Sequence, residues 1–596
     1  MLRSGVLTFV LAMGCAFAQT DGTIAGEVRD ATQAPIALAK IVVQSQDRGT
    51  SVEAKSGDNG EYIILGLQPG EYIVYAEFAG FQKAKSKVHV TTDGRAKLDF
   101  VLVPNESKQT VEVNADPPAL DTESGALTTT FTEREMQIFP LQGRGSLELA
   151  LLVPGVMGEA GSDEAGIFQD VPSAGAGLSV GGGRVGSTAI LADGAGSNSV
   201  GIGRATVTFS TDTIQEFQVI TSTFSAKYGV SGGGVINSVS KSGTNQLRGS
   251  AYWYHRNPSV NARQFNRPFP NNNRRQEFGL TIGGPVYIPK LYNGRRKTFF
   301  FASLEPKRYF DQIDIYSRFP TAAERTGDFR NSYVAPGQRR PMLYQQYRCV
   351  PAPQNCNQLT QLNRPNATAE YPLFGAGDPD PTKRGLVIPA YMIDPLAKKL
   401  LADVPLPNMP FDPQGRNYFG TRGVDGTDGR WNAKVDHHFS SRNRLSGRYS
   451  GVPLFSDRYR VAKGNVFMSY PSDISDTKQL MITDTHNFSP TILNDLRAIY
   501  TFGDYSRRPP GEMATTNYTK DVFGLPNVTN FGYPFFQTGF GNYGLDPGAG
   551  LGTYREHQYV DCPMPAAATT CGRPRKPIPA TTTHWAAPAD YSSLRF

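Results

Sequence analysis

Glu277-Phe278-Gly279-Leu280-Thr281-Ile282-Gly283 alternates apolar side chains with polar or small ones, and this two-residue period predicts a β-strand. The same period recurs at 431–436, 445–450 and 496–502. Because successive side chains of a strand point to opposite faces, each stretch has one apolar and one polar face. A membrane β-barrel requires this pattern, with lipid outside and a wet lumen inside, but a soluble β-sandwich shows the same period. Alternation alone therefore leaves both folds open.

The composition is typical of a large, turn-rich and mostly β protein. Of the 596 residues, 62 are glycine and 43 are proline, and aromatic residues reach 11%. A disordered chain lacks that aromatic content, and a helical bundle does not carry so much glycine and proline. The net charge of +7 is small for this length, and the basic residues form no stripe interleaved with aromatic residues. This charge pattern argues against nucleic acid as a partner.

The N-terminus predicts export from the cytoplasm. Residues 1–18 combine a charged start, a short apolar run and the cleavage site Ala16-Phe17-Ala18, which are the three parts of a secretory signal peptide. No later apolar run approaches the roughly 18 residues that a membrane helix needs. Any membrane-spanning part must therefore be a β-barrel, because only helices and closed barrels satisfy the backbone in lipid.

Four cysteines remain after the signal peptide, as two pairs that are close in the sequence. In an exported chain, we expect disulfides between Cys349 and Cys356 and between Cys562 and Cys571. A zinc site would need shorter spacings or nearby histidines, so no metal is expected here.

Residues 22–103 predict a small β-sandwich, because about seven short alternating runs are separated by turn signals. The segment resembles the carboxypeptidase regulatory-like domain, and that resemblance implies a non-catalytic, transthyretin-like module. The matching motifs are Gly26-x-Val28-x-Asp30, Asp58-x-Gly60-x-Tyr62, Leu67-x-Pro69-Gly70-x-Tyr72 and Gly80-Phe81.

Residues 104–120 read as a linker, and residues 121–245 form a glycine-rich segment. The latter has helical spacing at 133–138 and 146–152, and strand-like runs at 188–191, 216–221 and 234–239. It resembles the plug of TonB-dependent outer-membrane receptors, in particular the Oar-like branch. Lys227 departs from the glutamate that the family favours, and Ala192 interrupts the usual Leu-Asp-Gly. The matching motifs are Pro140-Leu141-Gln142-Gly143-Arg144, Leu152-Val153-Pro154-Gly155-Val156, Ile214-Gln215-Glu216-Phe217, Lys227-Tyr228-Gly229 with Gly232-Gly233-Gly234-Val235-Ile236-Asn237, and Lys241-Ser242-Gly243-Thr244-Asn245.

Residues 246–596 carry further Oar-like motifs, such as Ile282-Gly283-Gly284-Pro285 and Lys297-Thr298-Phe299-Phe300-Phe301. The resemblance covers residues 22 to about 505. It implies an N-terminal sandwich, an α/β plug and then the first part of an antiparallel transmembrane barrel. The polar, proline-rich residues 312–428 are expected to form a long surface loop.

The number of strands does not match that of a complete receptor. We find seven or eight candidate barrel strands between residues 246 and 561. Receptors of the resembled family have about 22 strands, whereas a closed barrel of about eight leaves room only for side chains. We therefore expect a truncated or frame-shifted copy that is not a working transporter by itself.

The patch Thr110, Val111, Glu112 and Val113 is the candidate site for energy coupling. The resemblance implies a TonB box in this linker, and an extended, β-prone peptide can add as a strand to the sheet edge of a partner. The alternative is a simple linker strand. The expected partners are the periplasmic domain of TonB, outer-membrane lipid and a bulky solute such as a carbohydrate or a peptide. The alternative function is that of a non-transporting surface or adhesion protein with the same architecture.

Enzymatic chemistry is not expected. Gly229-Val230-Ser231-Gly232-Gly233 fits the G-x-S-x-G pattern, but that motif needs a helix after the serine, and the sequence after Ser231 is glycine-rich and then strand-like. We interpret it as a turn. His437 and His438 would point to opposite faces of one strand, so they cannot share a metal. No cofactor is expected.

Overall fold

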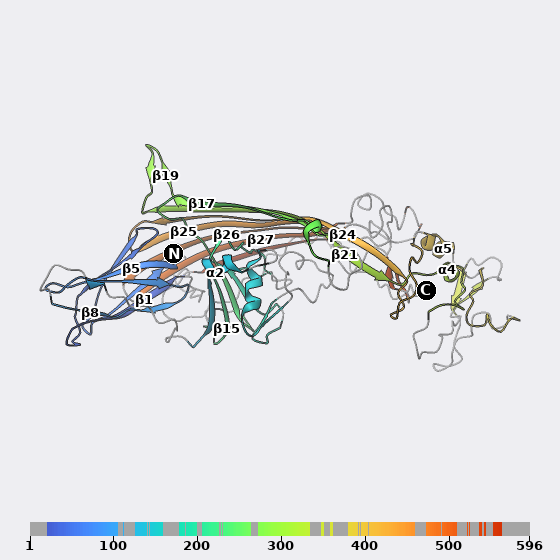
Figure 1. Ribbon diagram of the computed structural model, residues 1–596, viewed down its shortest axis with the longest axis horizontal. Coiled ribbons are helices and arrows are strands. Elements are labelled where there is room, and N and C mark those ends of the chain that lie inside the picture. Colours follow the sequence, from blue (N-terminus) through green and yellow to red (C-terminus); the bar gives the residue numbers. More distant parts are fainter. Residues whose placement is uncertain are drawn as a thin grey trace, which may run out of the picture.

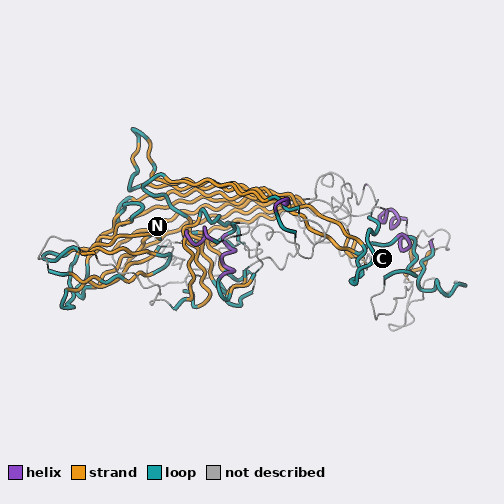
Figure 2. The backbone as a smooth tube through the Cα atoms, in the orientation of Figure 1, coloured by secondary structure: helices purple, strands orange, loops and turns teal. Residues whose placement is uncertain are grey.

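The computed structural model describes residues 21–104, 111–112, 125–139, 141, 144–158, 178–184, 186–198, 205–225, 228, 231–263, 272–333, 347–350, 358–361, 379–390, 393, 395–402, 404–458, 472–489, 492–508, 521, 524, 536–538, 541–543 and 552–562. The predicted signal peptide lies outside these residues. Strands dominate the described chain (Figure 2). Within it, no helix is both long enough and apolar enough to cross a membrane.

The N-terminal part is a sandwich of two small sheets. In one sheet, β1 (Gly22–Asp30) pairs antiparallel with β4 (Glu61–Leu67) and parallel with β7 (Arg95–Lys97) and β8 (Phe100–Leu102). The second sheet has the order β3 (Ser51–Lys55), β2 (Lys40–Ser45), β5 (Gly70–Glu77) and β6 (Ala84–Val90).

The sandwich core is formed entirely by residues between Ile24 and Leu102, with Ile41 and Val74 fully buried. The motif glycine Gly26 is required by a close approach, because a Cβ there would lie 1.8 Å from the carbonyl oxygen of Leu98.

The plug is built on a five-stranded sheet. Its helix α2 (Glu133–Ile138) starts with a capping box of Thr132 and Glu135, and residues Ser146–Leu152 form a 3-10 helix that ends before Pro154. The plug has a core of its own, around Met136, Leu149 and Phe217. The sheet order is β10 (Leu127–Thr132), β15 (Ile214–Ser222), β16 (Val235–Ser240), β13 (Ala189–Ala192) and β14 (Ala195–Gly196), with a separate pair β11 (Val156–Met157) and β12 (Ser179–Val180).

The barrel part is a sheet of eight antiparallel strands in chain order. Among the described residues its edges are β17 and β30, which do not pair with each other. The sheet is curved, and the plug and the sandwich lie on its concave side (Figure 1). The strands are β17 (Arg248–Arg256), β18 (Arg274–Pro285), β21 (Thr298–Ser317), β24 (Tyr418–His438), β25 (Asn443–Arg458), β26 (Ser472–Ser489), β27 (Ile492–Arg508) and β30 (Gly552–Cys562).

The two faces of this sheet differ as the alternation predicted. Leu280, Val435 and Leu480 point outward and are exposed, whereas Arg448, Gln479 and other polar side chains point inward and are buried. The remaining short elements are β9 (Val111–Glu112), η2 (Pro258–Val260), β19 (Tyr287–Ile288), β20 (Tyr292–Asn293), α4 (Ala322–Arg325), β22 (Tyr347–Val350), β23 (Gln358–Gln361), α5 (Pro395–Ala402), β28 (Phe536–Thr538) and β29 (Gly541–Tyr543).

The surface loop expected over 312–428 is shorter than predicted. β21 continues to Ser317 and β24 begins at Tyr418, so the connection between these two strands covers only 318–417. In β24 this part has polar residues or glycine at most positions of both faces, as at Thr421, Asp425 and Asp428, whereas the sequence of β21 still alternates through Gln312, Ile313, Asp314 and Ile315. A strand without an apolar face lacks the alternation that identifies it, although its backbone ladder continues.

Candidate functional site

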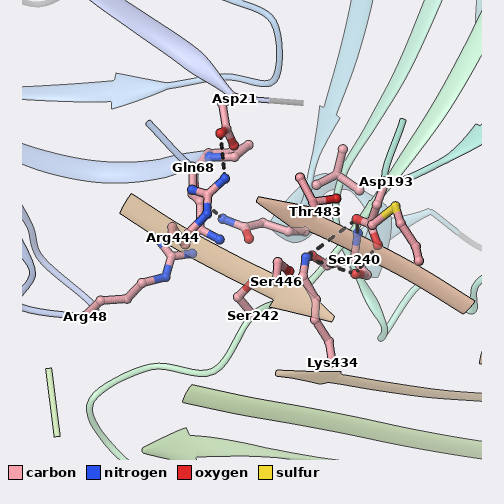
Figure 3. Close-up of a pocket in the computed structure, with 14 residues that line it drawn as sticks. Asp21, Arg48, Gln68, Asp193, Ser240, Ser242, Lys434, Arg444, Ser446 and Thr483 are labelled. Carbon is pink, nitrogen blue, oxygen red and sulfur yellow. Dashed lines mark hydrogen bonds and ion pairs between the residues drawn. The ribbon is translucent and has the colours of Figure 1, made fainter. Parts of the chain in front are cut away.

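The turn between β13 and β14 contacts the inner wall of the barrel through Asp193. This residue is 3% exposed and has a positive φ of 51°, a conformation that Asp tolerates better than most side chains. Its carboxylate accepts hydrogen bonds from the backbone N–H and the hydroxyl of Ser240, both at 2.7 Å. It also lies 3.7 Å from Nζ of Lys434 and 3.2 Å from Nε of Arg448 (Figure 3 shows Asp193, Ser240 and Lys434). One plug carboxylate thus joins β16 of the plug to β24 and β25 of the wall.

The wall also binds the backbone of the same turn. Arg448 donates to the carbonyl oxygen of Ala192 at 3.2 Å, and Arg497 donates to that of Asp193 at 3.3 Å. Gln479 donates to the carbonyl oxygen of Gly196 at 2.9 Å. Arg448 and Arg497 are almost fully buried. A buried guanidinium is costly without partners, so these hydrogen bonds fix the turn against the wall.

The sandwich contacts the same end of the wall. Asp21 forms an ion pair of 2.6 Å with Arg444, and Asn487 donates to the carbonyl oxygen of Leu65 at 3.2 Å. Between these contacts and Asp193 lies a cavity of about 30 Å³, whose lining includes Gln68 and Ser446 (Figure 3). Such a volume holds about one or two water molecules. The cavity lies between the three parts and is too small for a bulky solute.

The sandwich also binds the plug, through Glu216 on β15. This carboxylate is 2% exposed and accepts hydrogen bonds from the N–H and the hydroxyl of Thr92, both at 2.7 Å. His89 on β6 lies between two carboxylates, with Nε2 at 3.4 Å from Glu216 and Nδ1 at 2.7 Å from Glu71. The neighbouring carboxylate of Glu216, supported by that of Glu71, raises the pKa of His89 to about 8.

Further plug–sandwich hydrogen bonds surround this pair. Gln215 donates to the carbonyl oxygen of Pro69 at 2.7 Å, and the hydroxyl of Tyr228 donates to Asp93 at 3.1 Å. Burial is the main cause that raises the pKa of Tyr228, so its hydroxyl stays protonated as a donor.

The candidate TonB box is described only in its centre. Val111 and Glu112 form β9, which pairs in parallel with Ala84 and Lys85 at the edge of the sandwich. Thr110 and Val113 lie outside the described residues.

The structure also describes Ser231 and two of the four cysteines that were singled out in the sequence. The hydroxyl of Ser231 donates to the carbonyl oxygen of Gly234 at 2.5 Å, and the strand β16, not a helix, follows. Cys349 lies in β22 and Cys562 ends β30, whereas Cys356 and Cys571 lie outside the described residues. Both disulfides remain predictions. In the described part of the chain, no three His, Cys, Asp or Glu side chains are grouped to hold a metal.

The functional importance of the wall cations and of Glu216 was not predicted from the sequence. The available signal was the series Arg444, Ser446 and Arg448 at alternate positions of one predicted strand. That series was interpreted only as the face of the strand that meets the water-filled lumen. Arginines that face a plug, however, need hydrogen-bond acceptors on the plug.

The comparisons with known proteins agree with this architecture. Residues 239–561 match the family model of the outer membrane beta barrel domain, and residues 23–103 match that of the carboxypeptidase regulatory-like domain. Because the first match covers more than half of the chain, the protein belongs to the outer membrane β-barrel family, and its location is the outer membrane.

The TonB-dependent transporter Oar of Myxococcus xanthus is 25% identical over 390 residues, which are 62% of this chain and 34% of Oar. The chain thus spans about a third of the length of this relative. The predicted resemblance to the Oar-like branch and the predicted mostly-β fold are confirmed.

Solved receptors give partial structural matches. A mutant ferric enterobactin receptor of Pseudomonas aeruginosa has a TM-score of 0.37 at 11% identity, with 74% of this chain and 46% of the receptor covered. The outer membrane transporter YddB of Escherichia coli has a TM-score of 0.37 at 10% identity, with 72% and 44% covered.

The connections between strands orient the sheet in the membrane. β24–β25 and β26–β27 are joined by short turns, whereas β21–β24 and β25–β26 have long connections at the opposite end. In outer-membrane barrels the short turns face the periplasm. The sandwich, which contacts Arg444 and Asn487 beside the short turns, therefore lies at the periplasmic end.

Proposed function

We propose that the protein acts in TonB-dependent transport of a bulky solute, such as a carbohydrate or a peptide, across the outer membrane. The observation that carries this proposal is the polar character of the contact between plug and wall. Hydrogen bonds and ion pairs around Asp193 make this contact, while the only apolar cluster across it in the described residues is Ala195 with Met481 and Ile499.

A polar contact of this kind suits a plug that moves. Hydrogen bonds and ion pairs can be exchanged for bonds to water, so breaking them costs little net free energy compared with exposing an apolar core. The plug keeps its own core, which is separate from this contact. The plug can therefore leave the wall while its own core stays folded.

We propose that Thr110–Val113 is the TonB box. Its central residues already add as a strand to the edge of β6, which supports the capacity of this segment for strand addition. A strand of TonB would use the same backbone groups, so binding of TonB and pairing with β6 would compete.

Binding of the periplasmic TonB domain to the full chain in detergent micelles tests this assignment. Val111→Pro removes a backbone N–H and should weaken binding by at least about tenfold, because proline disrupts strand pairing. Ala115→Pro, in the same linker but outside the box, is the control and should bind like the parent. Equal affinities for both variants would show that the box lies elsewhere.

The adhesion protein remains the second candidate function. It shares the architecture and differs in needing no TonB, so an unchanged surface activity in a host without TonB would favour it.

A further inference from the structure

The connection between β18 and β21 is an ordered hairpin that stands away from the barrel sheet. β19 pairs with β20 through Tyr287 with Asn293 and Ile288 with Tyr292. Its base is closed by hydrogen bonds from Val286 N–H to Thr298 O and from Gly294 N–H to Val286 O, both at 2.9 Å. Figure 1 shows it projecting on the side of the sheet opposite to the plug and the sandwich. The hairpin therefore projects from the outer face of the sheet, held at its base by backbone hydrogen bonds.

The hairpin exposes apolar side chains that no other part of the described chain covers. Leu291 at its tip is 80% exposed, Tyr287 is 53% exposed and Ile288 is 47% exposed. These side chains contribute to none of the buried cores. A cluster of exposed apolar and aromatic side chains on a short, ordered element indicates a binding surface.

The hairpin is also strongly basic. Residues 286–297 contain Lys290, Arg295, Arg296 and Lys297 and no Asp or Glu. All four are exposed, and none forms an ion pair with the described residues, but the Arg296 side chain lies beside Gly49 of the sandwich. The Arg295 guanidinium lies 5.4 Å from the ring centroid of Tyr287, so cationic and aromatic groups share one surface. This surface fits a partner that has an apolar interior and an anionic surface.

The position of the hairpin identifies that partner. Its base at Thr298 pairs with His437, next to the short periplasmic turn after β24. The neighbouring strand β18 presents Leu280 and Ile282 outward, and these mark the lipid-facing band. The hairpin thus starts where the lipid face ends, on the periplasmic side. Aromatic residues concentrate at this level of outer-membrane barrels.

We propose that the β19–β20 hairpin is an anchor in the inner leaflet of the outer membrane, where it binds anionic phospholipid headgroups. Leu291, Ile288 and Tyr287 enter the boundary between headgroups and acyl chains. Lys290, Arg295 and Lys297 extend to the lipid phosphates, as long cationic side chains do at membrane surfaces. A protein partner is the alternative that the experiment distinguishes.

The test uses the full chain in detergent micelles that contain dibrominated phosphatidylglycerol or dibrominated phosphatidylcholine. Leu291→Trp adds a fluorophore at the tip, and the emission of the parent, which has 3 tryptophans, is subtracted. Leu406→Trp is the control, because Leu406 is also exposed but lies in the long connection between β21 and β24, on the opposite side of the membrane. Bromine quenches tryptophan only on contact.

We expect both lipids to quench the added tip tryptophan, and phosphatidylglycerol to do so about twofold more strongly at low salt. Adding Lys290→Gln, Arg295→Gln and Lys297→Gln should abolish that preference and leave the quenching by phosphatidylcholine. High salt should reduce the preference in the same way. The control tryptophan should respond to neither lipid.

Three results would overturn the proposal. Absence of quenching by both lipids would place the tip in water or against a protein. Equal quenching by both lipids would show apolar contact without headgroup recognition. A preference that survives the three glutamine substitutions would exclude these cations as its source.

Discussion

At the scale of single residues, one of the contacts between sandwich and plug is His89, which lies between the carboxylates of Glu71 and Glu216. His89 was visible in the sequence only as the single histidine of the sandwich. Its partner Glu216 belongs to another part of the chain, and nothing in the local pattern connects them. The raised pKa of His89 follows from its contact with Glu216 and Glu71. Long-range pairs of this kind come from docking of whole units, so sequence patterns do not predict them.

This pair makes the attachment dependent on pH. Because the pKa of His89 is raised to about 8, its contribution is fully present below its ordinary value of about 6.5 and is lost as the pH rises through about 8. We expect the protection of the Thr92 amide from hydrogen exchange, corrected for the intrinsic rate, to fall between pH 6.5 and pH 9. His89→Gln should show low protection at both values. A parent protein with constant protection would contradict the role of His89.

At the scale of elements, alternation located several strands in which one face meets lipid or a core, among them the lipid-facing segments of β18, β24, β25 and β27. It did not single out β26, although Leu480 and Ile482 of that strand are exposed on the outer face. It missed the distal end of β24, which has polar residues or glycine at most positions of both faces, and it also missed the distal end of β21, although Gln312, Ile313, Asp314 and Ile315 alternate there. The segment Ser146–Leu152 was predicted as helical from its spacing and is a 3-10 helix, since spacing does not distinguish these two helix types over two turns.

The sandwich is expected to be an independent folding unit. We propose that residues 22–103 fold alone, because every residue of their core lies within the segment. The isolated segment should unfold cooperatively in urea. Ile41→Ala should lower its free energy of unfolding by about 2–5 kcal/mol, since Ile41 is fully buried. Val101→Ala, at an exposed position, should change it far less. A disordered NMR spectrum of the isolated segment would show that it needs the plug or the wall.

At the scale of the whole molecule, the sandwich and the plug each have a core of their own, and both meet the barrel wall at mostly polar surfaces near the periplasmic end. The resemblance to known receptors predicted the order of the units, but the joint between them required the structure. The described barrel sheet has two edges, β17 and β30, whose unpaired backbone groups are costly in lipid. We therefore propose that transport requires further barrel strands that pair with these edges, whichever chain supplies them.

The central claim is that TonB moves the plug away from the wall. Ala195 is fully buried where β14 packs on Met481 and Ile499, so Ala195→Cys should react with a maleimide only when this contact opens. The measurement is labelling in an outer-membrane host with and without TonB, relative to the parent chain. Ala76→Cys, buried in the core of the sandwich, is the matched control and should stay unreactive. We expect labelling of Ala195→Cys only in cells with TonB, and equal labelling with and without TonB would show that TonB does not move the plug.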